Sequence, residues 1–329
     1  RLRRPTAAAR QPLAPDAEGR HGLLGHSPAM KTLVQKIETV ALTDSTVLIT
    51  GETGTGKELV ARAIHRLSPR RAMPLVRVNC AAIPEGMLES EMFGHVRGAF
   101  TGAVTARRGK FHLAHQGTLF LDEISGLSAT LQRKLLRVLQ EKEFEPLGSE
   151  RTVKVDVRIV TATNRDLARL AREGHFQEDL YYRLNVIPLP VPPLRERKDD
   201  IPLLANSFLE RFSRKLGKSI RGFAPEAMER LASYDWPGNV RELENVVERA
   251  AALSRSPIIV AESLSDVEGS ANVAPAVRSL DLHENLSAVT RETILRSLER
   301  VGGRKKDAAS LLGISQRALS YYLRKYRIQ

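Results

Sequence analysis

The segment GETGTGKE, residues 51–58, restricts the possible folds more than any other part of this sequence. It follows an apolar run, TVLIT, and precedes an amphipathic helical pattern, KELVARAIHRLS. Glycines let backbone N–H groups surround a phosphate, the start of a helix favours an anion, and a lysine here can reach the β- and γ-phosphates of a nucleotide. The order strand, loop, helix predicts a nucleotide site that contains Gly51, Glu52, Thr53, Gly54, Thr55, Gly56, Lys57 and Glu58.

Strand-like runs continue after this loop and alternate with helical patterns. They lie at 75–80, 118–123, 157–163 and 185–189. Repeated strand–helix–strand order predicts an α/β fold with a mostly parallel sheet that carries helices on both faces. The connections 81–117 and 125–156 are longer than a simple crossover requires, which is typical of functional insertions. The second connection contains a Leu-rich helix, LQRKLLRVLQE, and then FEPLGSERTVKV, which predicts a hairpin.

Charged side chains stand where nucleotide chemistry needs them. Glu58 replaces the Ser or Thr that usually binds Mg²⁺ in this loop, so the metal must depend on other groups. Asp122 and Glu123 end the strand TLFLDE; Asp122 could hold Mg²⁺ through water, and Glu123 could polarise an attacking water. An acidic strand end that faces solvent is the alternative. Thr163 and Asn164 end the next strand, near the predicted γ-phosphate position.

Two arginines fit the same hypothesis less directly. Arg183 precedes the last strand and could act on the nucleotide of a neighbouring subunit, although a surface salt bridge would also explain it. Arg241 lies in the first turn of a helix that Asn239 could cap. A cation in that turn opposes the helix dipole, and a nearby phosphate would explain it.

Composition divides the chain into five segments. We expect a linker at 1–22, an α/β subdomain at 23–190, an all-helical subdomain at 191–262, a second linker at 263–282 and a small helical domain at 283–329. The net charge is +13, and Lys and Arg gather after Val301, where Asp307 is the one acid. This concentration favours a nucleic-acid partner.

The last segment has the spacing of a helix-turn-helix. Helical patterns at 305–312 and 315–326 flank a turn at Gly313, and Ser315 can cap the second helix. The predicted DNA-facing residues are Gln316, Arg317, Ser320, Tyr321, Arg324 and Lys325. Apolar positions ahead of the turn predict a pairing surface and hence a dimer on a two-fold-related DNA site: Leu286, Val289, Ile294, Leu295, Leu298 and Val301. A basic helical hairpin without DNA-binding function is the alternative.

Other classes of protein are disfavoured. Cys80 is the only cysteine, so no disulfide within the chain is possible, and a buried thiol in a cytoplasmic protein is expected. His112 and His115 lack a third ligand and predict no metal site. No apolar run approaches the ~18 residues that span a bilayer, so we expect no membrane partner. Because the chain begins with Arg1, we expect it to be part of a longer protein.

The segment FGHVRGAFTGAV, residues 93–104, places an aromatic residue on a glycine-rich mount with no helix or strand period. Phe100 there is either packed within its own loop or exposed as an anchor for a partner. Together with GETGTGKE, GTLFLDEI, ATNRDL, DLYYRLNV, VPPLRER and WPGNVREL, it resembles the AAA+ ATPase domain of sigma-54-dependent transcriptional activators, the NtrC-like bacterial enhancer-binding proteins. The resemblance runs from about residue 23 to 262, and GAFTGA is close to diagnostic.

The resemblance implies roles for individual residues. Asp122 and Glu123 match the Walker B pair, and Arg241 matches sensor II. Asn164 with Thr163 matches sensor I, Arg183 the trans-acting arginine finger, and Asn79 the residue that couples to the Walker B glutamate. Gln177 stands where relatives usually have Arg, so any trans role of that position is lost or moved. The stretch before the Walker B acids is also assigned to ATP binding: Ala114, His115, Gln116, Gly117, Thr118, Leu119, Phe120 and Leu121.

The resemblance also implies partners. ATP and Mg²⁺ would be the cofactors, and dimers to hexamers the assembly. The loop that contacts sigma-54 in the RNA polymerase holoenzyme would be Gly98, Ala99, Phe100, Thr101, Gly102 and Ala103, and the C-terminal unit resembles the Fis-type domain. Two alternatives remain: a DNA-binding repressor that uses nucleotide only as a ligand, and an ATPase that remodels another protein.

Overall fold

The computed structural model describes residues 19–264, 290–291, 293–295, 297–298, 301–302 and 304–326. The chain divides into two compact units between Leu264 and Ser265, and each is described by itself. The predicted linkers fall almost entirely outside the described residues, as do Leu286 and Val289.

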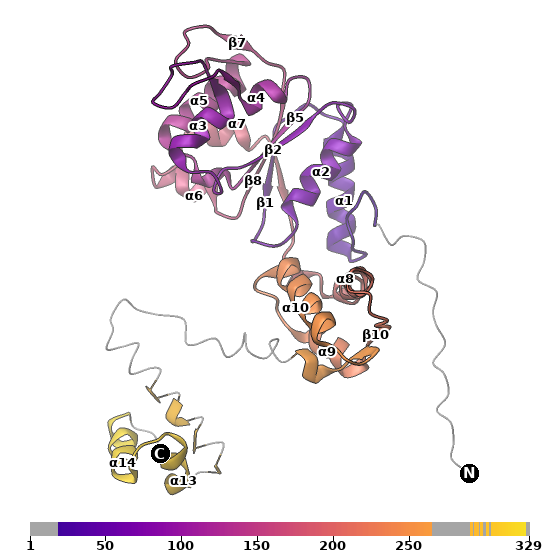
Figure 1. The fold of residues 1–329 in the computed structure, drawn as a ribbon, viewed down its shortest axis with the longest axis vertical. Coiled ribbons are helices and arrows are strands. Elements are labelled where there is room, and N and C mark those ends of the chain that lie inside the picture. Colours follow the sequence, from indigo (N-terminus) through magenta and orange to yellow (C-terminus); the bar gives the residue numbers. More distant parts are fainter. Residues whose placement is uncertain are drawn as a thin grey trace, which may run out of the picture. The chain divides into compact units, whose positions relative to one another are not determined.

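A parallel sheet forms the centre of the first unit (Figure 1). Its strand order is β2-β5-β8-β1-β9. The strands match the predicted runs: β1 Val47–Thr50, β2 Leu75–Asn79, β5 Thr118–Asp122, β8 Arg158–Thr163 and β9 Ile187–Pro190. The predicted α/β fold with a mostly parallel sheet is therefore confirmed.

Helices cover both faces of this sheet because alternate strand residues point to opposite sides. In β5, Leu119 and Leu121 enter one apolar core and Phe120 enters the other. The Phe120 face carries α1 Pro28–Ala41 and α2 Lys57–Leu67. The Leu119 face carries the remaining helices of the α/β part: α3 Glu85–Phe93, α4 Lys110–Leu113, α5 Ala129–Glu141, α6 Leu167–Arg172 and α7 Glu178–Leu184.

The two long connections lie against each other. The first contains β3 Gly94–His95 and β4 Arg107–Arg108, and the second contains the predicted hairpin, β6 Glu143–Phe144 with β7 Val153–Lys154. Leu147 of that hairpin donates its N–H to Gly94 O and accepts from Val96 N–H at 2.9 and 3.1 Å. The hairpin thus supports the base of the glycine-rich loop.

The remainder of the first unit is a small helical lid (Figure 1, orange). Its elements are η2 Leu194–Glu196, η3 Lys198–Asp200, α8 Ile201–Lys215, β10 Gly222–Phe223, α9 Pro225–Ser233, α10 Asn239–Leu253, β11 Ile258–Ile259 and η4 Ala261–Leu264. The prediction of an all-helical subdomain missed the short parallel pair β10–β11. Buried Asp200 accepts hydrogen bonds from Ser27 N–H and Oγ–H at 2.8 and 2.7 Å, which ties the lid to the start of α1.

The second unit contains the predicted helix-turn-helix, α13 Lys305–Leu311 and α14 Gln316–Lys325. Ser315 caps α14, because its Oγ accepts from Ala318 N–H at 3.1 Å. Ile294, assigned above to a pairing surface, is 2% exposed and packs with Leu319 and Leu323 instead. The two helices of the hairpin cannot bury their own apolar face, so Ile294 completes the core within one chain. Leu295, in contrast, is exposed.

Candidate nucleotide site, coupling loop and DNA-binding helix

The phosphate loop connects the carboxyl end of β1 to the first turn of α2. Gly51 N–H donates to Thr163 O at 3.3 Å, which joins the start of the loop to β8. Lys57 Nζ donates to Gly51 O at 2.9 Å and to Glu52 O at 3.2 Å. Burial lowers the pKa of Lys57, while Glu123 and Asp122 act in the opposite direction. The lysine therefore lies inside the loop, close to both predicted Walker B acids.

A cavity of about 330 Å³ collects the predicted chemistry. Both subdomains line it, with Thr53, Gly54, Gly56, Lys57, Glu58, Leu59, Arg62, Asp122, Glu123, Val240, Arg241 and Glu244. Burial raises the pKa of Asp122, although Glu123 N–H donates to its Oδ1 at 3.0 Å. Glu123 has a φ of 53°, a left-handed conformation that costs of order 1–3 kcal/mol and is concentrated at functional sites.

Glu58 lines the same cavity but is already paired. Arg62 donates to its Oε1 at 2.8 Å, and Arg77 contacts the same oxygen. These contacts lower the pKa of Glu58, with the Arg62 hydrogen bond as the largest cause. The carboxylate thus serves an arginine cluster on α2 and β2, consistent with a metal that depends on other groups.

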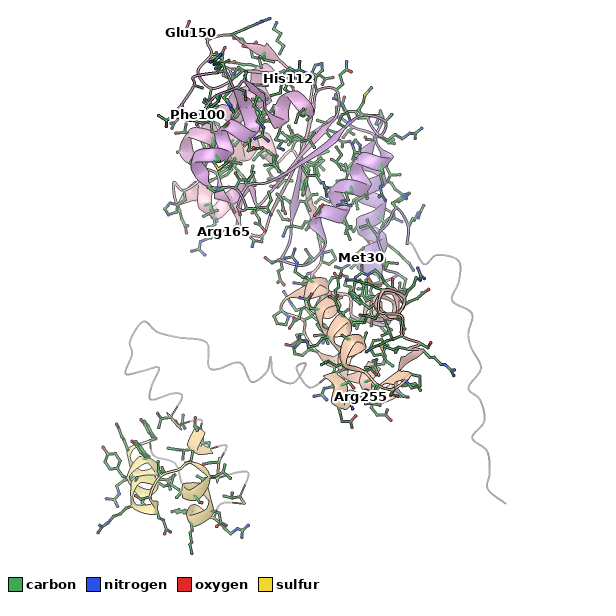
Figure 2. The ribbon with its side chains drawn as sticks, in the orientation of Figure 1. Met30, Phe100, His112, Glu150, Arg165 and Arg255 are labelled. Atoms are coloured by element: carbon green, nitrogen blue, oxygen red, sulfur yellow. The ribbon has the colours of Figure 1, made fainter. Side chains whose placement is uncertain are left out.

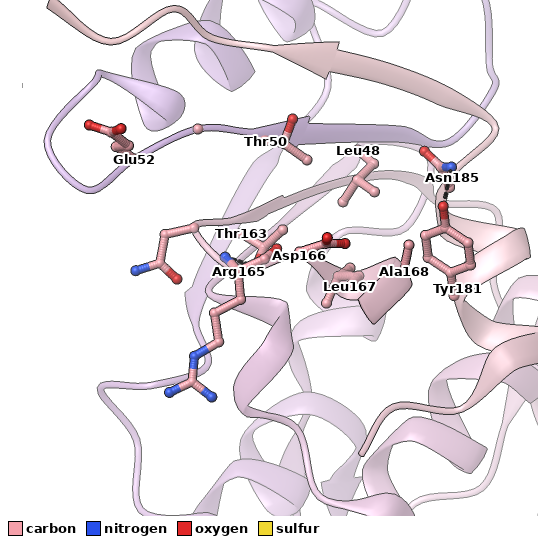
Figure 3. Close-up of a pocket in the computed structure, with 12 residues that line it drawn as sticks. Leu48, Thr50, Glu52, Thr163, Arg165, Asp166, Leu167, Ala168, Tyr181 and Asn185 are labelled. Carbon is pink, nitrogen blue, oxygen red and sulfur yellow. Dashed lines mark hydrogen bonds between the residues drawn. The ribbon is translucent and has the colours of Figure 1, made fainter. Parts of the chain in front are cut away.

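The end of β8 contacts the phosphate loop as well. Asn164 Nδ2 donates to Thr53 Oγ1 at 3.0 Å. Thr163 is buried, and its Oγ1 accepts from Arg165 N–H at 3.0 Å, so this side chain shapes the turn rather than facing the cavity. A neighbouring cavity has a volume of about 420 Å³. It is lined by residues 163–166 and by Glu52, Tyr181 and Asn185 (Figure 3).

Arg183 lies on α7 and Gln177 directly precedes this helix, and neither residue lines the cavity of about 330 Å³. Arg183 is exposed, and within the described part of the chain it has no hydrogen-bond or ion-pair partner. Gln177 precedes α7, and its N–H donates to Gln132 Oε1 at 2.7 Å. This chain's own nucleotide site therefore does not include Arg183, as a role in trans requires.

Asn79 ends β2 and Cys80 follows it, next to the carboxyl end of β5. Asn79 pairs in register with Asp122, and its Oδ1 accepts from Ala81 and Ala82 N–H at 3.0 and 3.1 Å. The Asn79 carbonyl is thus committed to its own turn. Burial raises the pKa of the Cys80 thiol to about 12, so the expected buried structural thiol is confirmed.

The assignment of residues 114–121 to ATP binding stays a prediction, and the structure places the start of this stretch at the amino end of β5. Thr118 Oγ1 lies 3.0 Å from His65 Nδ1, near the last turn of α2, whereas the phosphate loop meets its first turn. Leu119, Phe120 and Leu121 are buried in the two cores. Ligands of parallel sheets bind at the carboxyl ends of the strands, and this stretch covers the amino end of β5.

The lid contacts the phosphate loop through residues that the sequence patterns did not reveal. Arg195 donates to both carboxylate oxygens of Glu52, at 2.8 and 2.6 Å. Asn239 is buried at the first residue of α10, so its expected capping role was wrong: Gly238 occupies the N-cap position. Its Nδ2 donates instead to Glu52 Oε2 at 3.0 Å and to Thr53 O at 3.1 Å. Arg195 lies within the segment VPPLRER, which contributed to the family resemblance but predicted no contact with the phosphate loop.

Phe100 lies half-exposed on the glycine-rich loop (Figure 2). Its ring meets the edge of His95 with centroids 5.0 Å apart, and His95 Nδ1 lies 2.8 Å from Ser90 Oγ. Gly98 N–H donates to Ala103 O at 2.9 Å and closes the loop. A Cβ on Gly98 would meet nothing within 4 Å, so its positive φ of 82°, rather than crowding, calls for glycine.

The predicted DNA-facing residues occupy one exposed face of α14. Leu319 and Leu323 point into the core of this unit, and two of the positions between them, Ser320 and Tyr321, are exposed. All six predicted residues share this exposure: Gln316, Arg317, Ser320, Tyr321, Arg324 and Lys325. The face is basic and has the form of a recognition helix.

Within the described residues, no helix is long and apolar enough to cross a membrane. The same residues hold no group of three or more His, Cys, Asp or Glu side chains that could enclose a metal ion.

The fold and the site together define an AAA+ nucleotide-binding protein joined to a helix-turn-helix domain. Residues 23–190 match the sigma-54 interaction domain, 195–276 the AAA+ ATPase lid domain, and 286–326 the bacterial regulatory protein, Fis family. The chain belongs to the family of sigma-54-dependent transcriptional activators.

Individual relatives agree with this family. The regulatory protein AtoC of Escherichia coli K12 is 50% identical over 313 residues, covering 93% of this chain and 68% of AtoC. The transcriptional regulatory protein ZraR of Klebsiella oxytoca is 49% identical over 314 residues, covering 95% and 71%. A crystal structure of NtrX from Brucella abortus superposes with a TM-score of 0.74 at 38% identity, covering 93% of this chain and 69% of the NtrX chain. A crystal structure of NtrX in complex with ATP superposes with a TM-score of 0.71 at 38% identity, covering 93% of this chain and 70% of the NtrX chain.

Proposed function

We propose that this chain hydrolyses ATP in a homo-oligomeric ring and uses the energy to remodel the sigma-54 RNA polymerase closed complex through residues 98–103. One observation carries the proposal: Lys57, Asp122, Glu123 and Arg241 share one cavity, while Phe100 stands half-exposed on a separate loop. A nucleotide-binding repressor would need the cavity but not the loop.

The cavity residues fit a nucleotide with its metal. Mg²⁺ usually keeps several waters and binds one or two carboxylates plus substrate phosphates, so Asp122 with the phosphates suffices without a protein cage. Bound there, Mg²⁺ would neutralise charge on the β- and γ-phosphates. Lys57 and the first turn of α2 would hold the phosphates, and Glu123 would accept a proton from the attacking water. The complex of NtrX with ATP supports a nucleotide in this fold.

A neighbouring copy would complete the site. Arg183 is exposed and free of partners within the described residues, so it can reach a second subunit's nucleotide and stabilise charge in the transition state. Gln177, which is neutral, cannot share that role. Hydrolysis would therefore depend on assembly from dimers into a ring of up to six subunits.

The C-terminal unit would place the ring near its promoter. The basic face of α14 would enter a major groove, and a dimer of this unit would recognise two-fold-related sites upstream. The exposed Leu295 is available for such pairing, whereas Ile294 is not.

Phe100→Ala tests the proposal directly. The loop lies outside the nucleotide cavity, so hydrolysis should stay within a few-fold of the parent protein. An aromatic anchor at a partner surface is typically worth ~2 kcal/mol or more, so sigma-54 capture should fall by more than about tenfold. Thr101→Ala should behave similarly.

Two variants calibrate this experiment. Lys57→Ala should lose nucleotide binding, whereas Glu123→Gln should bind ATP and fail to hydrolyse it. Transcription that survives in Phe100→Ala would show that the loop is not the coupling device and would favour another remodelling target. Normal turnover in Glu123→Gln would refute the catalytic assignment.

A further inference from the structure

Arg195, in η2 at the start of the lid, grips the phosphate loop from outside the nucleotide cavity. Its guanidinium forms a two-pronged contact with Glu52, at 2.8 and 2.6 Å. Asn239 adds a third hydrogen bond to this carboxylate, and its own Oδ1 accepts from Leu194 N–H at 2.8 Å. Glu52, Arg195 and Asn239 therefore form one connected cluster, which we term the outer clamp.

Three successive carbonyls of the phosphate loop are also held by groups from beyond β9. Thr53 O accepts from Asn239 Nδ2 at 3.1 Å, Gly54 O from Arg241 N–H at 3.3 Å, and Thr55 O from Arg197 Nη2 at 3.0 Å. In a trans peptide the carbonyl and the following N–H point in opposite directions. Holding these carbonyls outward therefore directs the next N–H groups away from the lid contacts.

The N–H groups that follow these carbonyls, those of Gly54, Thr55 and Gly56, are the donors that a bound anion needs. Gly54 and Gly56 N–H have no acceptor among the described residues, and Thr55 N–H makes only a long 3.4 Å contact with Glu52 O. Unpaired N–H groups in a concave loop form an anion-binding nest. The direction of the nest thus depends on contacts that never touch the nucleotide.

Close packing and charge pairing both hold the outer clamp against the phosphate loop. A Cβ on Gly54 would lie 2.2 Å from Gly238 O, so the lid approaches as closely as glycine permits. Hydrogen bonds from Arg195 first, and then Asn239, lower the pKa of Glu52 to about 2. This carboxylate stays ionised at neutral pH, and Arg195 offsets a negative charge that would otherwise repel phosphates.

We propose that Arg195 and Asn239 are positioning residues that organise the phosphate loop, so that nucleotide affinity depends on the outer clamp. The proposal rests on the nucleotide site of the proposed function. If only a fraction of molecules holds the loop correctly, the apparent dissociation constant rises by the inverse of that fraction. ADP and ATP should then be affected equally, because the nest binds phosphates that both share.

Arg195→Gln is the test, with Lys198→Gln as its matched control. Lys198 belongs to the same segment but reaches Asp235 and Ser233 O, within the lid. Direct binding of fluorescent ADP and ATP, together with KM and kcat, is measured on the whole chain. We expect Arg195→Gln to weaken both affinities about three- to tenfold and to raise KM equally, with kcat within about twofold, as the loss of one charged, two-pronged contact predicts. Lys198→Gln should bind like the parent.

If Arg195→Gln loses stability, the charge-swapped double variant Glu52→Arg with Arg195→Glu still tests the proposal. Recovery of ADP affinity in this pair supports the clamp, whereas recovered stability without recovered affinity overturns it. Unchanged ADP affinity in a folded Arg195→Gln protein also overturns it, as does equal weakening by Lys198→Gln. If the parent binds ADP but does not hydrolyse ATP, the proposed function fails while these binding outcomes still decide the clamp.

Discussion

Replacing Gly54 with alanine, and Gly56 with alanine as its control, separates backbone strain from contact with the lid. Both glycines have a positive φ, 82° and 101°, so a Cβ strains the backbone at either position. The surroundings differ. At Gly54 the new Cβ would lie 2.2 Å from Gly238 O, whereas at Gly56 the nearest atom is Leu59 Cδ1 at 4.0 Å.

The magnitude follows from these distances. A left-handed conformation costs a residue with a Cβ roughly 1–2 kcal/mol, and both variants should lose about that much stability. In Gly54→Ala the lid must also retreat by roughly 1 Å, which breaks the hydrogen bond from Arg241 N–H to Gly54 O and disturbs the neighbouring buried contacts. We expect this to add about 1–3 kcal/mol.

Urea unfolding without nucleotide measures the difference, since a Cβ at Gly56 could also disturb bound phosphates. With an m-value of about 2 kcal/mol/M, the midpoint of Gly54→Ala should lie roughly 0.5–1.5 M below that of Gly56→Ala. Equal midpoints would show that Gly238 moves aside without cost, and the close approach of the lid would then contribute nothing to stability.

Other predictions address assembly, DNA and pH. Mixing the Arg183→Ala and Lys57→Ala proteins should partly restore hydrolysis, because the Lys57→Ala subunits supply Arg183 to the intact phosphate loops of the Arg183→Ala subunits. If subunits exchange and no mixing ratio restores hydrolysis, a role for Arg183 in trans is excluded. Removal of 283–329 should abolish specific DNA binding and spare hydrolysis at high protein concentration, and intact affinity should fall steeply with added salt, as filter binding can show. Glu52 has a folded-state pKa of about 2, below its ordinary 4.5, so it stabilises the fold above pH 4.5 and loses this contribution as the pH falls towards 2. The stability advantage of the parent over Glu52→Gln, followed by urea unfolding, should shrink over that interval, and a constant difference would contradict the ionised clamp.

Local sequence patterns were sufficient for the parts of the molecule that depend on neighbouring residues. The strand–loop–helix order around Lys57, the five sheet strands and the cap at Ser315 all rest on interactions within a few positions, and the structure contains each of them. The repeated strand–helix–strand order likewise predicted that both faces of the sheet are covered. Direction along an element is harder to infer from sequence: residues 114–118 come shortly before the predicted Walker B acids but lie at the opposite end of β5.

Only the tertiary structure decided how the lid meets the phosphate loop. Glu52 and Asn239 are 187 positions apart, and Glu52 and Arg195 are 143 apart. Residues so distant leave no periodicity or spacing in the chain, and local rules gave Asn239 the ordinary role of a helix cap. Burial of the lid against α1 and the loop removes water from Asn239, and its amide must then find partners within the protein. That requirement, which exists only after packing, turns an unremarkable asparagine into a contact with the nucleotide site.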